Sequence, residues 1–124
     1  MFVNTVIIMV SITLFVGTGP YTAERPFTAL RFAYTAQLDE NTVKMFFFED
    51  GIFALKKNQN PSNIYNIQEW VQNCFEEKDF EIAACGVCMK ARGVDASELI
   101  DGVKIGTMEM AVEWTKQSDK QLFF

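Results

Sequence analysis

The chain has 124 residues, a net charge of −5 at neutral pH and 49% hydrophobic residues, among them 12 phenylalanines. These values predict one folded domain, residues 1–124, and exclude a disordered chain. The Lys and Arg residues are scattered, so we expect no direct nucleic-acid binding. Because there is no histidine, Ser-His and Cys-His catalytic pairs and histidine-ligated metals are excluded.

The first 16 residues are strongly apolar, and we interpret most of them as a buried first strand. The first basic residue is Arg25 and no clear signal-cleavage site is present, which argues against a secretory signal. The run is also shorter than the roughly 20 residues of a membrane helix, so no membrane association is expected. An atypical signal or anchor is the alternative. Translation starting at Met9 would explain the run's excess length and make residues 1–8 an extension.

A turn cluster at residues 17–20 ends this strand, and a helix with Pro26 in its first turn follows. The expected apolar stripe of this helix is Ala23, Phe27, Leu30, Tyr34 and Leu38. Residues 43–48 are the second strand. Its three consecutive phenylalanines favour a parallel sheet that is covered on both faces. A short helical piece through residues 53–55 comes next.

The pattern predicts a longer helix at residues 63–77, with Ser62 or Asn63 as its N-cap. Its expected core stripe is Ile64, Ile67, Val71 and Cys74. On that stripe Cys74 is a small buried hydrophobe. The third strand covers residues 80–84 and leads directly to a second cysteine.

The last third of the chain begins with a turn that we expect Ser97 to cap. A short strand at residues 103–106 and a helix capped by Thr107 follow. The expected core face of this helix is Met108, Ala111, Val112 and Thr115, and the expected second apolar ridge is Met110 and Trp114. Residues 120–124 are the closing strand.

Strands and helices thus alternate along the chain, which predicts an α/β fold with a parallel sheet between helix layers. In such sheets, reactive groups gather beyond the carboxyl ends of the strands. The segment 17–19, Asp50 and Cys85 all fall at this edge. The glycine-rich segment matches neither a dinucleotide fingerprint nor a phosphate-binding loop, so no nucleotide cofactor is predicted.

Cys85 is the candidate nucleophile. It lies where a strand ends and a helix begins, and the first-turn amides of a helix favour a thiolate there. An inert buried cysteine is the alternative. Cys88 lies within one helical turn and either forms a disulfide with Cys85 or packs into the core. Asp50 either polarises or gates the cysteine site or is a solvated turn residue.

A structural zinc site is disfavoured, because such sites use four Cys or His ligands and the chain has three cysteines, Cys74 among them. No metal or other cofactor is therefore predicted. Arg92 and Gly93 have the pattern of a helix stop, with Gly93 in the left-handed position after the last turn.

Cys85, followed seven residues later by Arg92 and Gly93, resembles the C-x6-R-G signature of the DsrE/DsrF/TusD-like sulfurtransferases. Further landmarks of that family are matched in order by residues 19–21, 46–51 and 122–124. The resemblance extends over about residues 9–124. It implies a single DsrE-like domain with a three-layer α/β/α fold and a five-stranded, mainly parallel sheet.

The resemblance also implies a cytoplasmic sulfur carrier, a sulfurtransferase that accepts a sulfane sulfur as a persulfide on Cys85. The implied partners are a sulfur donor such as a TusA-like carrier, a downstream acceptor protein, and further copies of the chain in a trimer or hexamer. The family's DsrE and TusD members usually have a small apolar residue where this chain has Cys88. That second thiol could resolve the persulfide, releasing sulfide and leaving a disulfide.

Two other functions remain open. A dithiol redox protein would use Cys85 and Cys88 as an exchangeable disulfide pair. A non-catalytic oligomeric binding module would use neither cysteine, and both could then be replaced without loss in cells.

Overall fold

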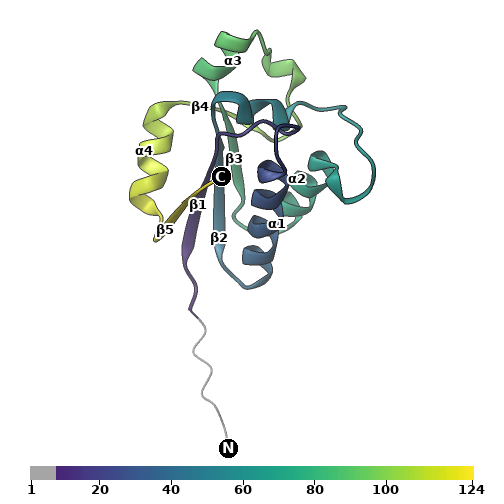
Figure 1. The fold of residues 1–124 in the computed structure, drawn as a ribbon. Coiled ribbons are helices and arrows are strands. Elements are labelled where there is room, and N and C mark those ends of the chain that lie inside the picture. The colour runs from purple at the N-terminus through teal and green to yellow at the C-terminus, as the bar shows by residue number, and fades with distance from the viewer. Residues whose placement is uncertain (1–7) are drawn as a thin grey trace, which may run out of the picture.

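The computed structural model describes residues 8–124, which form a five-stranded sheet with helices on both faces (Figure 1). The strands are β1 (Ser11–Val16), β2 (Thr42–Phe47), β3 (Glu81–Cys85), β4 (Lys104–Gly106) and β5 (Lys120–Phe123). Their order is β4-β3-β2-β1-β5, and each neighbouring pair is parallel. The predicted parallel α/β sheet is confirmed. The expected extension falls almost wholly on residues 1–7, outside the described part of the chain.

The helices form a layer on each side of the sheet. α1 (Arg25–Leu38) and α2 (Ile67–Glu76) pack together on one face, and α4 (Met108–Gln117) covers the other (Figure 1). The short α3 (Gly86–Arg92) lies beyond the carboxyl ends of the strands. The predicted three-layer α/β/α architecture is therefore confirmed. None of the helices in residues 8–124 has the length and apolar character needed to cross a bilayer.

The central strands are buried on both faces, as their continuous apolar runs predict. Leu14 and Phe47 are fully enclosed. On the α4 side, Phe46 meets the indole of Trp114 edge-on, with ring centroids 6.2 Å apart, an arrangement that aromatic pairs prefer. A core on each side of β1 and β2 thus holds the carboxyl ends of the strands in place.

The helix predicted at residues 63–77 is interrupted. A 3-10 turn, η2 (Asn63–Tyr65), precedes α2, and the side chain of Asn66 caps α2 by accepting a hydrogen bond from Glu69 N. The prediction of Ser62 or Asn63 as the cap is wrong, because Asn63 has a φ of 59°, which an α-helix cannot continue. Ile64, 57% exposed, is consequently not a core residue.

Two further predictions near the C-terminus are corrected. In α4 the structure buries Ala111 and Trp114, whereas Met108 is 68% exposed and Val112 is 53% exposed. Because the large indole of Trp114 packs against the sheet, α4 is rotated so that Ala111 and Trp114 face the sheet. Met108 and Val112, which belong to the predicted core face, are left in solvent. The turn η3 (Ala96–Glu98) is capped by the carboxylate of Asp95 rather than by Ser97.

Candidate functional site

The first element of the site is Cys85, at the junction of β3 and α3. It is the N-cap of α3, as predicted, but its thiol accepts no hydrogen bond from the first turn. Its side chain is only 5% exposed. Because α3 has just seven residues, its dipole is also weak. The expected stabilisation of a Cys85 thiolate by first-turn amides is therefore not observed.

The second element is Cys88, half-buried and one turn further along α3. Its sulfur accepts a hydrogen bond from the backbone N–H of Glu49, with N and Sγ 3.0 Å apart. Glu49 has a φ of 47°, in the left-handed region that side chains rarely adopt. The prediction placed an amide of the first turn of α3 at Cys85. In the structure the amide belongs to Glu49, in the turn after β2, and it contacts Cys88.

Opposing influences act on the Cys88 thiol. Burial, together with a hydrogen bond shared with Cys85, raises the pKa of Cys88 above its usual value. The Glu49 amide and the positive charge of Arg92 act in the other direction, because both favour the thiolate. Both cysteines are free thiols. The Cys88 thiol is therefore protonated at rest, with groups beside it that stabilise negative charge when it develops.

Gly51 explains how the turn after β2 reaches the cysteines. A Cβ atom on Gly51 would lie 2.1 Å from the carbonyl oxygen of Val16, so only glycine allows the turn to approach the end of β1 this closely. The N–H of Phe48 also donates to Val16 O at 2.9 Å. These contacts hold the start of η1 (Glu49–Leu55) against the sheet, with the Glu49 amide facing α3.

The third element is an ion pair between neighbouring segments. Arg92 Nε donates to Asp50 Oδ1 at 2.8 Å, and Arg92 Nη1 donates to the carbonyl oxygen of Cys88 at 3.4 Å. Gly93, with a φ of 64°, ends α3 in the left-handed conformation, as predicted. Asp50 thus acts on the site indirectly, because its carboxylate holds the guanidinium of Arg92 beside Cys88.

Cys74 lies apart from this group. It is fully buried in α2, and burial, together with the nearby charge of Glu77, raises the pKa of its thiol to about 12. The prediction that it is a buried hydrophobe is confirmed. Among residues 8–124, no group of three or more His, Cys, Asp or Glu side chains is placed to hold a metal ion.

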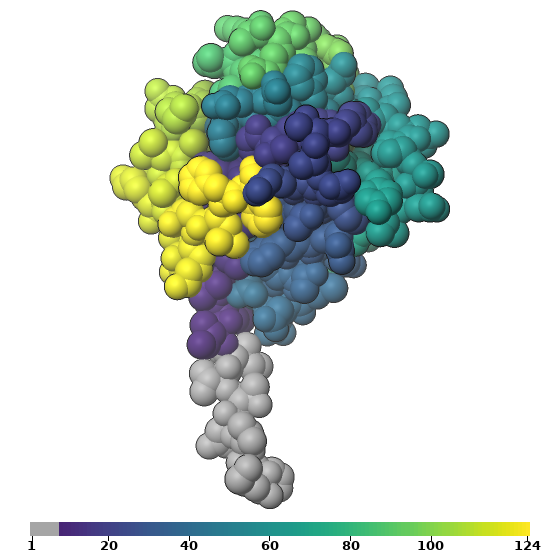
Figure 2. Space-filling model, viewed as in Figure 1, coloured from purple at the N-terminus to yellow at the C-terminus, as the bar shows by residue number. Residues whose placement is uncertain are grey.

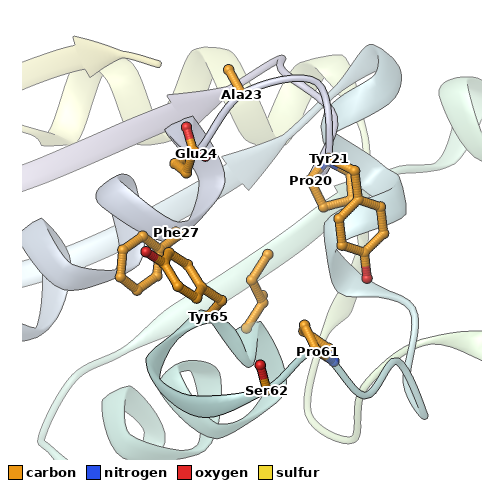
Figure 3. A pocket seen from close by; sticks show the side chains of 9 residues that line it. Pro20, Tyr21, Ala23, Glu24, Phe27, Pro61, Ser62 and Tyr65 are labelled. Carbon is orange, nitrogen blue, oxygen red and sulfur yellow. The ribbon is translucent and has the colours of Figure 1, made fainter.

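A surface pocket of about 300 Å³ lies on the α1 and α2 side of this edge (Figure 3). Tyr21, Phe27 and Tyr65 project into it from the segment before α1, from α1 and from η2. A second hollow, of about 320 Å³, shares Tyr21 with the first and extends to Asp50. The carboxyl edge is thus hollowed on one side, up to the residue that orients Arg92.

Sequence reasoning missed the Glu49 amide and the Asp50–Arg92 pair. A signal for the pair existed: residues of opposite charge follow the ends of β2 and β3, which are neighbours in the sheet. The left-handed Glu49 had no signal, because nothing in its sequence context predicts a positive φ at a glutamate.

Three comparisons with known proteins identify the family and the fold. The model of the DsrE/DsrF-like family matches residues 10–124. An uncharacterized protein of Methanopyrus kandleri is 45% identical over 113 residues, which are 91% of this chain and 93% of that protein. Protein YchN of Escherichia coli is 31% identical over 94% of this chain and 100% of its own length. The crystal structure of YchN superposes with a TM-score of 0.85 over the same share of both chains.

Proposed function

The chain belongs to the DsrE/DsrF-like family, and from this premise we propose that it is a sulfur carrier that holds a persulfide on Cys85. The observation that supports this most directly is the placement of two free thiols together at the carboxyl edge of a parallel sheet. Reactive groups of such folds gather at this edge. In this proposal the chain is a sulfurtransferase, and Cys85 is its catalytic residue.

The transfer is an exchange at sulfur. The thiolate of Cys85 attacks the outer sulfur of a donor persulfide, so that a new S–S bond forms and the donor's S–S bond breaks. The donor leaves as a thiolate, and Cys85 carries the sulfane sulfur. An acceptor thiolate repeats the exchange and restores Cys85. The cycle requires no oxidant, reductant or metal.

The proposed partners follow from this chemistry. A small sulfur-carrier protein of the TusA type would supply the persulfide, and a second protein thiol would receive it. Such thiols stay reduced in the cytoplasm, where we place the protein. All three cysteines are free thiols, as this compartment requires.

The test is a loading experiment with glutathione persulfide as the donor. We expect an increase of about 32 Da, one sulfur atom, that fragment-ion mass spectrometry assigns to Cys85 and that a reductant removes. In Cys85→Ser protein, position 85 should carry no added sulfur. Cys74→Ala is the matched control, because Cys74 lies in the core far from the edge, and it should load normally. Absence of any retained sulfur on the wild-type chain would refute the proposal.

We also propose that the chain forms a symmetric homo-oligomer, a trimer or hexamer. Its support is the exposure of three apolar residues, Met108 and Val112 on α4 and Phe123 on β5. In Figure 2 the yellow-green α4 and the yellow β5 lie side by side on the surface. β5 is an edge strand, and exposed apolar edges are typical of surfaces that pair with another chain. Light scattering after gel filtration tests this. A monomer at micromolar concentration would refute it.

A dithiol redox protein is the second candidate, favoured by two free thiols three residues apart, Cys85 at the N-cap of α3 and Cys88 in its first turn. It predicts a Cys85–Cys88 disulfide whose reduction potential lies in the range of disulfide oxidoreductases. A glutathione redox titration, read by alkylation and mass spectrometry, separates the two functions. A stable disulfide without sulfur loading would favour the redox protein.

A further inference from the structure

We propose that Cys88 is the first acceptor of the sulfur and passes it to Cys85, with the Glu49 amide and the Asp50-held Arg92 stabilising its negative charge. The inference rests on the proposed sulfur-carrier function and adds an order of events. It starts from three observations at the carboxyl edge: which sulfur is accessible, which sulfur is hydrogen-bonded, and where the guanidinium lies.

Accessibility favours Cys88. Cys85 is 5% exposed at the end of β3, whereas Cys88 is half-buried on the next turn of α3. Val87, between them, is 78% exposed, so this part of α3 faces solvent. A donor sulfur is the terminal atom of another protein's side chain, and an attacking thiolate must reach it. Cys88 is therefore the thiol that a donor meets first.

The hydrogen bonds favour Cys88 as well. The N–H of Glu49 points at its sulfur from 3.0 Å, and such an amide stabilises charge that develops on the acceptor. The turn holds this amide in a left-handed conformation, which shows that the surrounding structure imposes its direction. The Cys85 thiol has no equivalent donor in the first turn of α3.

Arg92 supplies the second stabilising group. Its guanidinium contacts the backbone of Cys88 and is held in place by Asp50. The charge of Arg92 and the hydrogen bond from the Glu49 amide both oppose the rise in pKa that burial and Cys85 cause at Cys88. Asp50 and Arg92 are thus positioning residues that act on Cys88.

The two steps balance without a co-reactant. The Cys88 thiolate attacks the outer sulfur of the donor persulfide, an S–S bond forms at Cys88, and the donor leaves as a thiolate. The Cys85 thiolate then attacks that same terminal sulfur, so that the S–S bond at Cys88 breaks and Cys88 returns as a thiolate. Cys85 is the N-cap of α3 and Cys88 lies three residues further on, in its first turn, so the second step is a local exchange.

The decisive experiment is a time course with glutathione persulfide, stopped by alkylation and read from the fragment ions of the peptide that contains both Cys85 and Cys88. We expect persulfide on Cys88 before Cys85. Cys88→Ser should slow the loading of Cys85 by about tenfold or more, whereas Cys85→Ser should leave the loading of Cys88 close to wild type.

The outcomes separate the two proposals. If Cys85 loads at the wild-type rate in Cys88→Ser protein, the relay is wrong and the sulfur-carrier function stands. If neither cysteine retains sulfur in the wild type, the function itself fails, and the relay fails with it.

The positioning residues have their own test, in Cys85→Ser protein so that only Cys88 reacts at this edge. Arg92→Gln should move the pH midpoint of Cys88 alkylation upwards and slow its loading by about three- to tenfold. Arg92→Lys should restore part of both, and Asp50→Asn should give a smaller change in the same direction. Lys90→Gln, an exposed basic residue of α3, is the matched control and should change neither. Equal effects of Arg92→Gln and Lys90→Gln would overturn the assignment.

Discussion

Cys74 and Cys88 occupy helices at opposite ends of the sheet, and their surroundings differ in one essential way. Cys74 is enclosed near the C-terminal end of α2, where burial raises its pKa to about 12. Cys88 also has a raised pKa, but an amide and a guanidinium beside it favour the thiolate. Burial alone makes a thiol inert, whereas burial combined with oriented donors holds it ready to react.

The largest expected effect is on reactivity. With a pKa of about 12, only about one Cys74 thiol in ten thousand is ionised at about pH 8, and it is shielded as well. We therefore expect iodoacetamide to label Cys88 at least about 100-fold faster than Cys74 in the native protein. Peptide-resolved mass spectrometry measures both rates in one sample.

Urea provides the control for this comparison. In the unfolded chain both thiols are exposed to solvent and have the ordinary pKa of a cysteine, so Cys74 and Cys88 should be labelled at similar rates. Comparable native rates would show that the two ends of the sheet do not differ as described.

The second effect is on stability. Cys74→Ser places a hydroxyl among apolar side chains, and we expect a loss of about 2 kcal/mol in the free energy of unfolding. The half-buried Cys88 should tolerate serine within about 0.5 kcal/mol. Urea denaturation midpoints of the two variants measure the difference. If Cys88→Ser proved the more destabilising, Cys88 would be a structural residue.

This contrast also shows what the sequence could predict. Helical spacing assigned Cys74 to the core, and the strand–helix junction located Cys85, because both depend on local periodicity. The Asp50–Arg92 pair and the Glu49 amide come from segments that meet only in the folded sheet. The exposed face of α4 was mispredicted for a similar reason, since the packing of Trp114 against Phe46 decides its rotation.

The third effect concerns the coupling of the two thiols at the reactive end. Cys85 raises the pKa of Cys88 through their shared hydrogen bond, so Cys85→Ala should lower that pKa. Labelling of Cys88 should then be about two- to fivefold faster near neutral pH, while labelling of Cys74 stays unchanged. A pH–rate profile of alkylation measures the shift. An unchanged or higher midpoint would contradict the coupling.

The smallest expected effect is on stability, at the amino end of β3, the strand that ends at Cys85. There a hydrogen bond from Lys104 lowers the pKa of the Glu81 carboxyl. A folded-state pKa below the unfolded value stabilises the protein above the ordinary range of a glutamate and loses this contribution as the pH falls. Because both side chains are substantially exposed, we expect only about 0.5 kcal/mol at neutral pH.

Glu81→Gln is the variant that measures this contribution. Its urea midpoint should fall below that of wild type at neutral pH and converge with it as the pH falls through the lowered pKa of Glu81, below which the carboxyl is protonated in both states. The labelling rate of Cys88 should not change, because the ion pair and the thiols lie at opposite ends of β3. A change in that rate would show that the two ends are coupled through the strand, and the reactivity of Cys88 would then depend on the whole sheet as well as on the donors beside it.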